Sequence, residues 1–219
     1  TTIGRAKSRG FEYSSGTAAS NIFPTTSIYK HYLFDIVLYT HLNIKTAQSF
    51  TTGETVTGGT SGATATVQSL STTESATITG ATQASPCVVT CSGGHNFKEG
   101  QQITIASVGG MTDINTVHTV RNPSSTTFEL FGTDGTTAVN TGSSSAYSSG
   151  GTAAHGVVIV SNVQGTFSAG ETITGGTSSN TAAIQADAVG FKGVTSHDFT
   201  AVKQIAMAGS PTFTADTAL

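Results

Sequence analysis

The chain contains no tryptophan, only two cysteines and four prolines, and just 10% of its 219 residues are charged. Nine Lys and Arg against 12 Asp and Glu give a net charge of −3, which argues against the clustered cations that a nucleic-acid binder needs. No apolar run reaches the ~18 residues that span a bilayer, and no signal-peptide pattern opens the chain. We therefore expect a soluble, unsecreted protein that binds neither nucleic acid nor membrane. Because Thr1 takes the place of an initiator Met, we also expect a processed product or a segment of a longer polypeptide.

The two cysteines lie four residues apart in an apolar, β-branched stretch, Cys87 and Cys91. Four residues along a strand separate two Cα atoms by about 13 Å, far more than the roughly 4.4 to 6.8 Å of a disulfide. Cys or His partners at zinc-ligand spacing are also lacking. We expect two buried thiols that act as small hydrophobic side chains, the alternatives being a metal or redox role.

Hydroxyl side chains and glycine are abundant: the chain has 41 Thr, 26 Ser and 26 Gly. Threonine favours the half-buried surface of a β-sheet, whereas serine and glycine favour turns. An average globular chain has about 25% charged residues, so hydroxyls and main chain must solvate much of this surface. The composition predicts an all-β fold of small barrel or sandwich modules.

An 18-residue segment, Phe50–Val67, recurs as Phe167–Ile184, 117 residues later, with 11 identical positions. Each copy has an apolar anchor, a tight turn, a short strand, a Gly-Gly turn and a second strand, which predicts a β-hairpin. A hairpin alone is marginal in water, so each copy needs a surface to pack on, the other copy being one candidate. The residues to which we assign these anchor and turn positions are Phe50, Gly53, Glu54, Gly58, Gly59, Phe167, Gly170, Glu171, Gly175 and Gly176.

Turn signals and composition divide the chain into five segments. They are an N-terminal arm (1–27), a long strand with the first hairpin repeat (28–76), an inserted small β-barrel (77–150), the second hairpin repeat (151–190) and a C-terminal strand or arm (191–219). The pattern of the inserted segment predicts four short strands, over 86–91, 102–108, 116–121 and 126–132. It also predicts a Ser/Gly-rich exit linker at the end of the segment, over 143–151. Residues 194–207 predict a further strand pair, although 201–208 suit helical turns equally well.

Residues 28–42 place their large apolar residues on one parity, as a long strand with one buried face requires. The other parity carries Tyr29, His31, Asp35, Tyr39 and His41, which we expect to be solvated or to lie at an interface. Three cations on the N-terminal arm share one parity and form either a solvated face or a docking site for an acidic neighbouring subunit. The interface candidates are Arg5, Lys7, Arg9, Tyr29, His31 and Tyr39.

Both ends of the chain are poor in large apolar residues. Ordering a residue costs roughly 1 to 2 kcal/mol of backbone entropy, which such segments do not recover by their own burial. We expect neighbouring subunits in an assembly to hold them.

The stretch Ser85–Asn115, together with Thr119-Val120 and Thr127–Leu130, carries the pattern His95-x-Phe97-x-x-Gly100, Ile103-x-Ile105 and Gly110-Met111. It resembles a module of tailed-bacteriophage virion proteins that is named after the first catalytic-cysteine half-domain (FCCH) of ubiquitin-activating enzymes. The resemblance implies a small β-barrel without that enzyme's nucleotide site or nucleophile. It makes His95 a structural turn residue, and we expect Asp113 and Asn115 to close the next loop through side-chain to main-chain bonds.

The opening Ile3–Gly16, the segment Tyr29–Ile36 and the Phe-x-x-Gly-Glu-Thr repeat are similar to large structural proteins of contractile-tailed marine cyanophages. The similarity implies a non-enzymatic virion protein of the tail, baseplate or capsid, assembled in the host cytoplasm. Its expected partners are copies of itself and other virion proteins, joined through strand edges and arms. The alternative is a receptor- or carbohydrate-binding fibre module that recognises a host surface glycan.

Enzymatic patterns are weak, and we assign no catalytic, cofactor-binding or metal-binding residue. Ser196-His197-Asp198 has the composition of a catalytic triad, but adjacent strand residues face opposite sides. Glu54 and Glu171 have the residue type of a glycosidase pair, although shared turn geometry explains their repetition more simply. A tail-associated hydrolase that uses Glu54 or His197 is therefore a third hypothesis.

Overall fold

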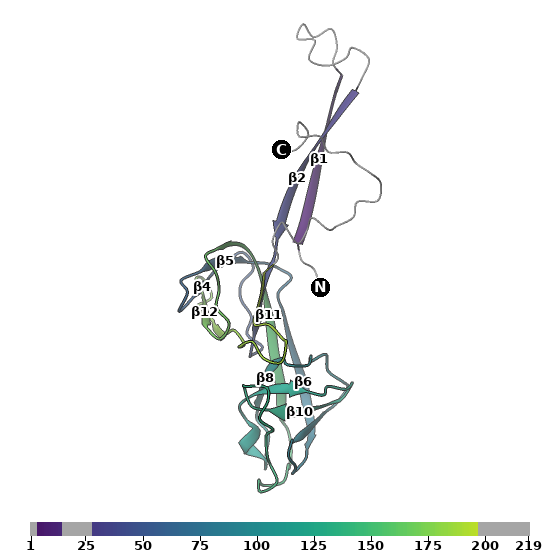
Figure 1. Ribbon diagram of the computed structural model, residues 1–219, viewed down its shortest axis with the longest axis vertical. Coiled ribbons are helices and arrows are strands. Elements are labelled where there is room, and N and C mark those ends of the chain that lie inside the picture. The colour runs from purple at the N-terminus through teal and green to yellow at the C-terminus, as the bar shows by residue number, and fades with distance from the viewer. Residues whose placement is uncertain (1–3, 15–27, 197–219) are drawn as a thin grey trace. The chain divides into compact units, whose positions relative to one another are not determined.

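The computed structural model describes residues 4–14 and 28–196, and all regular elements in them are β-strands apart from one short 3-10 turn. The expected all-β class is therefore confirmed. The chain divides into two compact units, of which the first holds β1 (Gly4–Ser14) and β2 (Ile28–Leu38) and the second spans Thr40–Ser196 (Figure 1). Among the described residues, no helix is both long and apolar enough to cross a membrane.

The first unit contains an antiparallel ribbon in which β1 and β2 pair along their whole length. Eleven residue pairs run from Gly4 opposite Leu38 to Ser14 opposite Ile28, in a sheet of only these two strands. Residues 4–14, which belong to the predicted N-terminal arm, thus form one strand of this ribbon.

The second unit contains a six-stranded barrel, here called the repeat barrel, built mainly from the two hairpin copies. Antiparallel neighbours run in the order β13-β12-β4-β5-β11-β3, and an isolated bridge between Ile44 and Ile184 closes the ring. Its strands are β3 (Thr40–Ile44), β4 (Thr55–Gly58), β5 (Thr64–Val67), β11 (Thr152–Gln164), β12 (Thr172–Gly175) and β13 (Thr181–Ala183). The short β14 (Val194–Ser196) pairs with β3.

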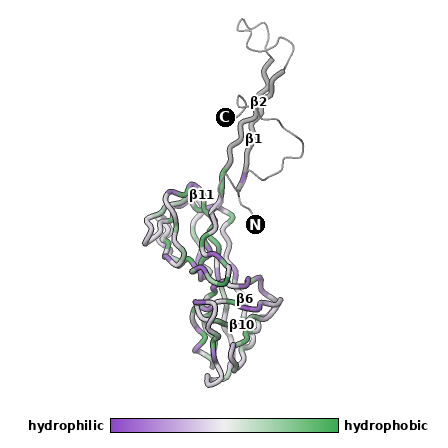
Figure 2. The backbone as a smooth tube through the Cα atoms, viewed as in Figure 1, coloured by the Kyte–Doolittle hydropathy of each residue, from purple (hydrophilic) through white to green (hydrophobic). Residues whose placement is uncertain are grey.

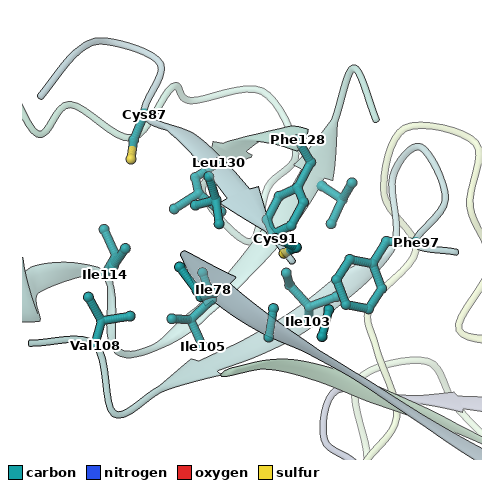
Figure 3. Close-up of a cluster of buried hydrophobic side chains, with 14 of the residues drawn as sticks. Ile78, Cys87, Cys91, Phe97, Ile103, Ile105, Val108, Ile114, Phe128 and Leu130 are labelled. Carbon is teal, nitrogen blue, oxygen red and sulfur yellow. The ribbon is translucent and has the colours of Figure 1, made fainter. Parts of the chain in front are cut away.

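A second ring, here called the inserted barrel, runs β11-β6-β7-β10-β9-β8 and returns to β11. Phe97, Phe128 and a set of Ile, Val and Leu side chains fill its core (Figure 3). Its own strands are β6 (Thr72–Ala81), β7 (Val88–Cys91), β8 (Gln102–Ala106), β9 (Val117–Arg121) and β10 (Thr127–Phe131), with the 3-10 turn at Thr112–Ile114.

The 13-residue strand β11 belongs to both barrels (Figure 1). Ala153 lies in the core of the inserted barrel, whereas Val158 and Val160 lie in the core of the repeat barrel. Odd and even residues of a strand face opposite sides, so the two barrels lie on opposite faces of β11. The inward-facing parity of β11 changes at Gly156, where an added Cβ would lie 3.0 Å from the Ile44 side chain.

Barrel closure limits where strand edges are open. The main-chain edges of both six-stranded rings are paired within the chain, which removes the open sheet edges that favour association. The walls of the barrels therefore offer no continuous open edge among the described residues, and the predicted association through strand edges concerns the described strands outside the rings. Outside the rings, the described strands include the β1–β2 ribbon and β14.

The long strand expected over 28–42 is interrupted at Tyr39, between β2 and β3. His41 is 7% exposed, so a solvated side chain at this position is wrong within this chain, and the interface candidate Tyr39 is 3% exposed. Alternation fails here because residues of both parities in β3 are buried, which means that both faces of this strand are covered.

The Ser/Gly-rich segment 143–151 is not a linker. Tyr147 packs against the core of the inserted barrel, and its hydroxyl donates to the Ile78 carbonyl at 3.1 Å. The Gly109 N–H donates to the Ser149 carbonyl at 2.8 Å. Figure 2 shows short hydrophobic and hydrophilic stretches intermixed along both barrels.

Candidate functional site

The two hairpin copies pair with each other through β4 and β12. The register places Thr57 opposite Thr174, Val56 opposite Gly175 and Gly58 opposite Ile173. Thr57 and Thr174 are equivalent positions of the repeat, so a local two-fold axis passes between them. The hypothesis that each copy packs on the other is confirmed.

Each copy supplies a glutamate to the Gly-Gly turn of the other copy. Glu54 accepts hydrogen bonds from the main-chain N–H groups of Thr177 and Ser178, both at 2.9 Å, and from the Ser178 hydroxyl at 2.8 Å. A fourth bond comes from the N–H of Thr51, in its own copy, at 2.6 Å.

The second glutamate repeats this arrangement about the two-fold axis. Glu171 accepts from the N–H groups of Thr60 at 3.1 Å and Ser61 at 2.9 Å, and from the Ser61 hydroxyl at 2.8 Å. The Ser168 N–H completes the set at 2.7 Å. Sequence reasoning assigned both glutamates to their own hairpins and missed this exchange.

The environment keeps both carboxylates ionised. Glu54 is 5% exposed and Glu171 is 6% exposed, and this burial raises the pKa of each carboxyl group. The hydrogen bonds from the opposite turn and from the local main chain outweigh burial, so both pKa values lie below the ordinary value. A glycosidase general acid needs a raised pKa. Neither carboxyl group has that property, and both are saturated with structural hydrogen bonds.

The glycines of the repeat make room for this exchange. A Cβ on Gly58 would lie 2.7 Å from a carboxylate oxygen of Glu171, and one on Gly175 would lie 2.7 Å from a carboxylate oxygen of Glu54. The N–H of Gly59 donates across the axis to the Thr172 carbonyl, and that of Gly176 donates to the Thr55 carbonyl, both at 2.8 Å. The second glycine of each pair therefore joins the two copies through the main chain.

The tight turns and apolar anchors also lie where the repeat predicts them. Gly53 and Gly170 have φ values of +86° and +87°, a conformation that glycine adopts without strain. Phe167 is buried in the repeat-barrel core, whereas Phe50 is half-buried and packs against that core. The two copies thus differ in how far their anchor is covered.

Two fully buried glutamines join the barrels. The Gln185 side-chain oxygen accepts from the Gln102 N–H at 3.0 Å, and the Gln102 side-chain oxygen accepts from the Ala186 N–H at 3.3 Å. Gln185 also donates to the Gly100 carbonyl at 3.2 Å. This joint was not predicted, because a glutamine within or beside a strand carries no sequence signal for burial.

The inserted barrel confirms a structural role for His95. Its ring stacks on Phe97 with centroids 4.8 Å apart, and its Nε2 lies 3.3 Å from the Thr127 carbonyl. Asn115 closes the loop as expected, since its side chain bonds to both main-chain groups of Val108, at 2.9 and 3.0 Å. The expectation for Asp113 is wrong: it accepts from the Ser144 hydroxyl at 2.6 Å and so ties two loops together.

The two thiols are free and buried, as expected. Burial raises the pKa of Cys91 to about 11 and also raises that of Cys87, where hydrogen bonds from Thr141 and Thr82 oppose the effect. Neither thiol has the depressed pKa of a reactive cysteine.

A hydrogen-bonded cluster around the buried His155, in the inserted barrel, was not predicted. The Gln101 amide nitrogen lies 2.9 Å from His155 Nδ1, and His155 Nε2 lies 3.2 Å from a carboxylate oxygen of Glu74. Burial lowers the pKa of His155 despite the opposing effect of Glu74. The same Glu74 accepts from the Asn96 N–H at 2.5 Å, so the cluster anchors the loop between β7 and β8.

The ribbon register contains five of the six interface candidates, all except Tyr39. Arg5 pairs with Val37, Lys7 with Asp35, Arg9 with Leu33, Phe11 with His31 and Tyr13 with Tyr29. All these positions share one parity, and Arg5 is exposed. The side chains of Lys7, Arg9, Tyr29 and His31 lie outside the part of the chain that is described. Of Ser196-His197-Asp198, the last two residues also lie outside it.

Residues 84–156 match the family model described as the ubiquitin-activating enzyme E1 FCCH domain. The match covers β7 to β10 and the first part of β11, which together form most of the inserted barrel. No curated protein matches the chain. The inserted barrel is therefore FCCH-like, in agreement with the resemblance seen in its sequence.

Proposed function

We propose that this chain is a non-enzymatic structural protein of a phage virion, whose copies associate with one another and with other virion proteins through the β1–β2 ribbon. The observation that carries the proposal is the contrast between the ribbon and the barrels. The two rings pair their edges internally, whereas the ribbon forms a two-stranded sheet whose outer edges find no partner among residues 4–14 and 28–196.

Energetics supports a partner for the ribbon. A two-stranded hairpin is marginally stable in water, and a third strand or a packing surface is normally needed. An unpaired strand edge offers N–H and C=O groups that a strand of another molecule can complete. Eleven paired positions per strand make this edge longer than the mean strand of about five to six residues.

The barrels support a passive rather than a catalytic role. The two carboxylates that most resembled catalytic groups are occupied by turn N–H groups, and the buried thiols have raised pKa values. The FCCH-like module and the similarity to cyanophage structural proteins favour a virion component. We propose that this component lies in the tail, the baseplate or the capsid of the virion.

Charge reversal in the ribbon tests the proposal. The triple variant Arg5→Glu, Lys7→Glu, Arg9→Glu changes one face of β1, and we expect it to sediment as a monomer where the unmodified chain forms oligomers. The matched control Lys45→Glu, Lys98→Glu alters the second unit and should leave the oligomers intact. A monomeric unmodified chain, or oligomers unaffected by the triple variant, would contradict assembly through the ribbon.

The virion assignment needs a separate test on particles. Mass spectrometry of purified particles should find peptides of this chain in amounts comparable to known structural proteins, and gold-labelled antibody should decorate the particles. Absence from particles would reject the virion location, whatever the oligomeric state of the purified chain.

A further inference from the structure

A hollow opens on the repeat barrel beside the first hairpin copy. Its cavity volume is about 150 Å³, below the roughly 300 to 1,000 Å³ of sites that enclose a whole drug-sized ligand, which suits a shallow site for one ring of a larger ligand. Val157 and Val158 of β11 and the half-buried Phe50 supply its apolar surface. The rest of its lining is polar and uncharged: Gln48, Ser49, Thr52, Gln68, Ser69, Ser71, Thr72 and Thr73.

Some of these polar groups are used by the fold and others are not. Ser71 binds the main chain of Ile159 and Gln68, and the Gln68 amide donates to the Ser161 hydroxyl at 2.8 Å. The remaining hydroxyls make no hydrogen bond with any described residue: Ser49, Thr52, Ser69, Thr72 and Thr73. The lining of the hollow therefore combines polar groups that the fold already uses with hydroxyls that remain free, and it includes one aromatic residue, Phe50.

The second hairpin copy provides an internal comparison. The positions 117 residues after Thr52, Ser69, Ser71 and Thr72 are Ala169, Ala186, Ala188 and Val189. In that copy Gln185, the equivalent of Gln68, is fully buried and reaches the inserted barrel. In the first copy the equivalent surface is open and four of its positions carry hydroxyls. The local two-fold symmetry thus breaks at the hollow, in side-chain chemistry as well as in exposure.

We infer that this hollow binds a neutral polyhydroxylated ligand, a saccharide unit of an oligosaccharide chain. Hydroxyl and amide groups together with an aromatic and two valine side chains match the polar and apolar surfaces of a sugar ring. The lining carries no charged side chain, so it offers no ion-pair partner to an anionic or cationic ligand. The inference stands apart from assembly through the ribbon, which involves other residues.

Maltohexaose, cellohexaose and chitohexaose serve as neutral probes, with sialyllactose as the anionic contrast. Saturation-transfer NMR and titration calorimetry on the full chain should detect binding of at least one neutral probe, with sialyllactose weaker. The double variant Ser69→Ala, Thr72→Val introduces the residues of the second copy and so keeps side chains that this scaffold already holds. Losing two neutral hydrogen bonds should weaken binding about tenfold.

The control variant Thr174→Val removes an exposed hydroxyl on β12, away from the hollow, and should bind as the unmodified chain does. Three results would each overturn the inference: no neutral probe binds at about 10 mM, sialyllactose binds as well as the neutral probes, or the double variant retains full affinity. Thermal unfolding of both variants shows whether any loss of affinity comes from unfolding.

Discussion

Glu54 accepts a hydrogen bond at 2.9 Å from the main-chain N–H of Ser178, a residue 124 positions later in the chain. The two-fold equivalent joins Glu171 to Ser61, also at 2.9 Å. Each hairpin copy thus supplies the carboxylate that accepts hydrogen bonds from the Gly-Gly turn of the other copy. The duplicated segment behaves as a pair of mutually dependent halves, and this explains why both glutamates are present in the repeat.

Removing either carboxylate charge should destabilise the second unit. A glutamine at position 54 keeps the volume but places an amide next to N–H donors that need an acceptor. We expect Glu54→Gln and Glu171→Gln each to lower the free energy of unfolding by about 3 kcal/mol, since hydrogen bonds to charged groups contribute about 1.5 to 3 kcal/mol each. Urea unfolding measures the loss.

The matched control is Glu129→Gln, which removes an acceptor used by the Asn122 side chain in an exposed pair. It should cost less than about 1 kcal/mol. An equal loss of unfolding free energy in all three variants would show that the exchange between the copies stabilises the chain no more than an exposed hydrogen bond does.

The glycines that face the two carboxylates should tolerate no side chain. Gly58→Ala and Gly175→Ala place a Cβ 2.7 Å from a glutamate oxygen, and we expect a loss of about 2 to 4 kcal/mol because the carboxylate must move away from buried donors. Gly80→Ala is the control, since its Cβ would meet the nearest atom at 3.8 Å. Calorimetric unfolding that ranks Gly80→Ala with the other two would refute this explanation.

Stability should fall in two stages as the pH is lowered. Burial lowers the pKa of His118 and His155 below 6.5 in the folded chain, so their contribution is complete above pH 6.5 and is lost as the pH falls below that value. Glu54 and Glu171 have folded pKa values below 4.5, so their contribution is complete above pH 4.5 and is lost on further acidification.

Melting temperatures measured from pH 8 to pH 3, roughly the range in which these groups titrate, test this order. The double variant Glu54→Gln, Glu171→Gln should retain the upper stage and lose part of the lower one. If the double variant kept an unchanged profile below pH 4.5, the carboxylates would not be responsible for the acid limb.

Both thiols should be inert in the native chain. Cys87 and Cys91 are buried, and burial raises the pKa of Cys91 to about 11, so little thiolate exists at pH 8. We expect Ellman's reagent to modify neither thiol before unfolding and both thiols in denaturant. Rapid modification of the folded chain would mean that β7 opens or that the core is not packed as described.

Local signals in the sequence predicted the hairpins and several strands of the inserted barrel. The Gly-Gly turns and the His95-x-Phe97-x-x-Gly100 pattern act over a few residues, and the structure places their strands within two or three residues of the expected bounds. The anchors, turns and loop-closing Asn115 follow from the same short-range chemistry.

Longer-range features escaped prediction for identifiable physical reasons. β11 was missed because its inward parity changes at Gly156, where it passes from one core to the other, so its run Val157–Val160 shows no alternation. The buried Gln102–Gln185 joint and the exchange of glutamates connect positions 83 and 124 residues apart. The segment 143–151 has the composition of a linker because exposed and packed loops use the same Ser and Gly residues.

The central claim, that the ribbon edges are completed by other molecules while the barrels complete themselves, is tested most directly by amide hydrogen exchange at several protein concentrations. We expect the amides of β1 and β2 to gain protection as the concentration rises, whereas those of both barrels are protected throughout. Ribbon amides that exchange at the same rate at every concentration would contradict it.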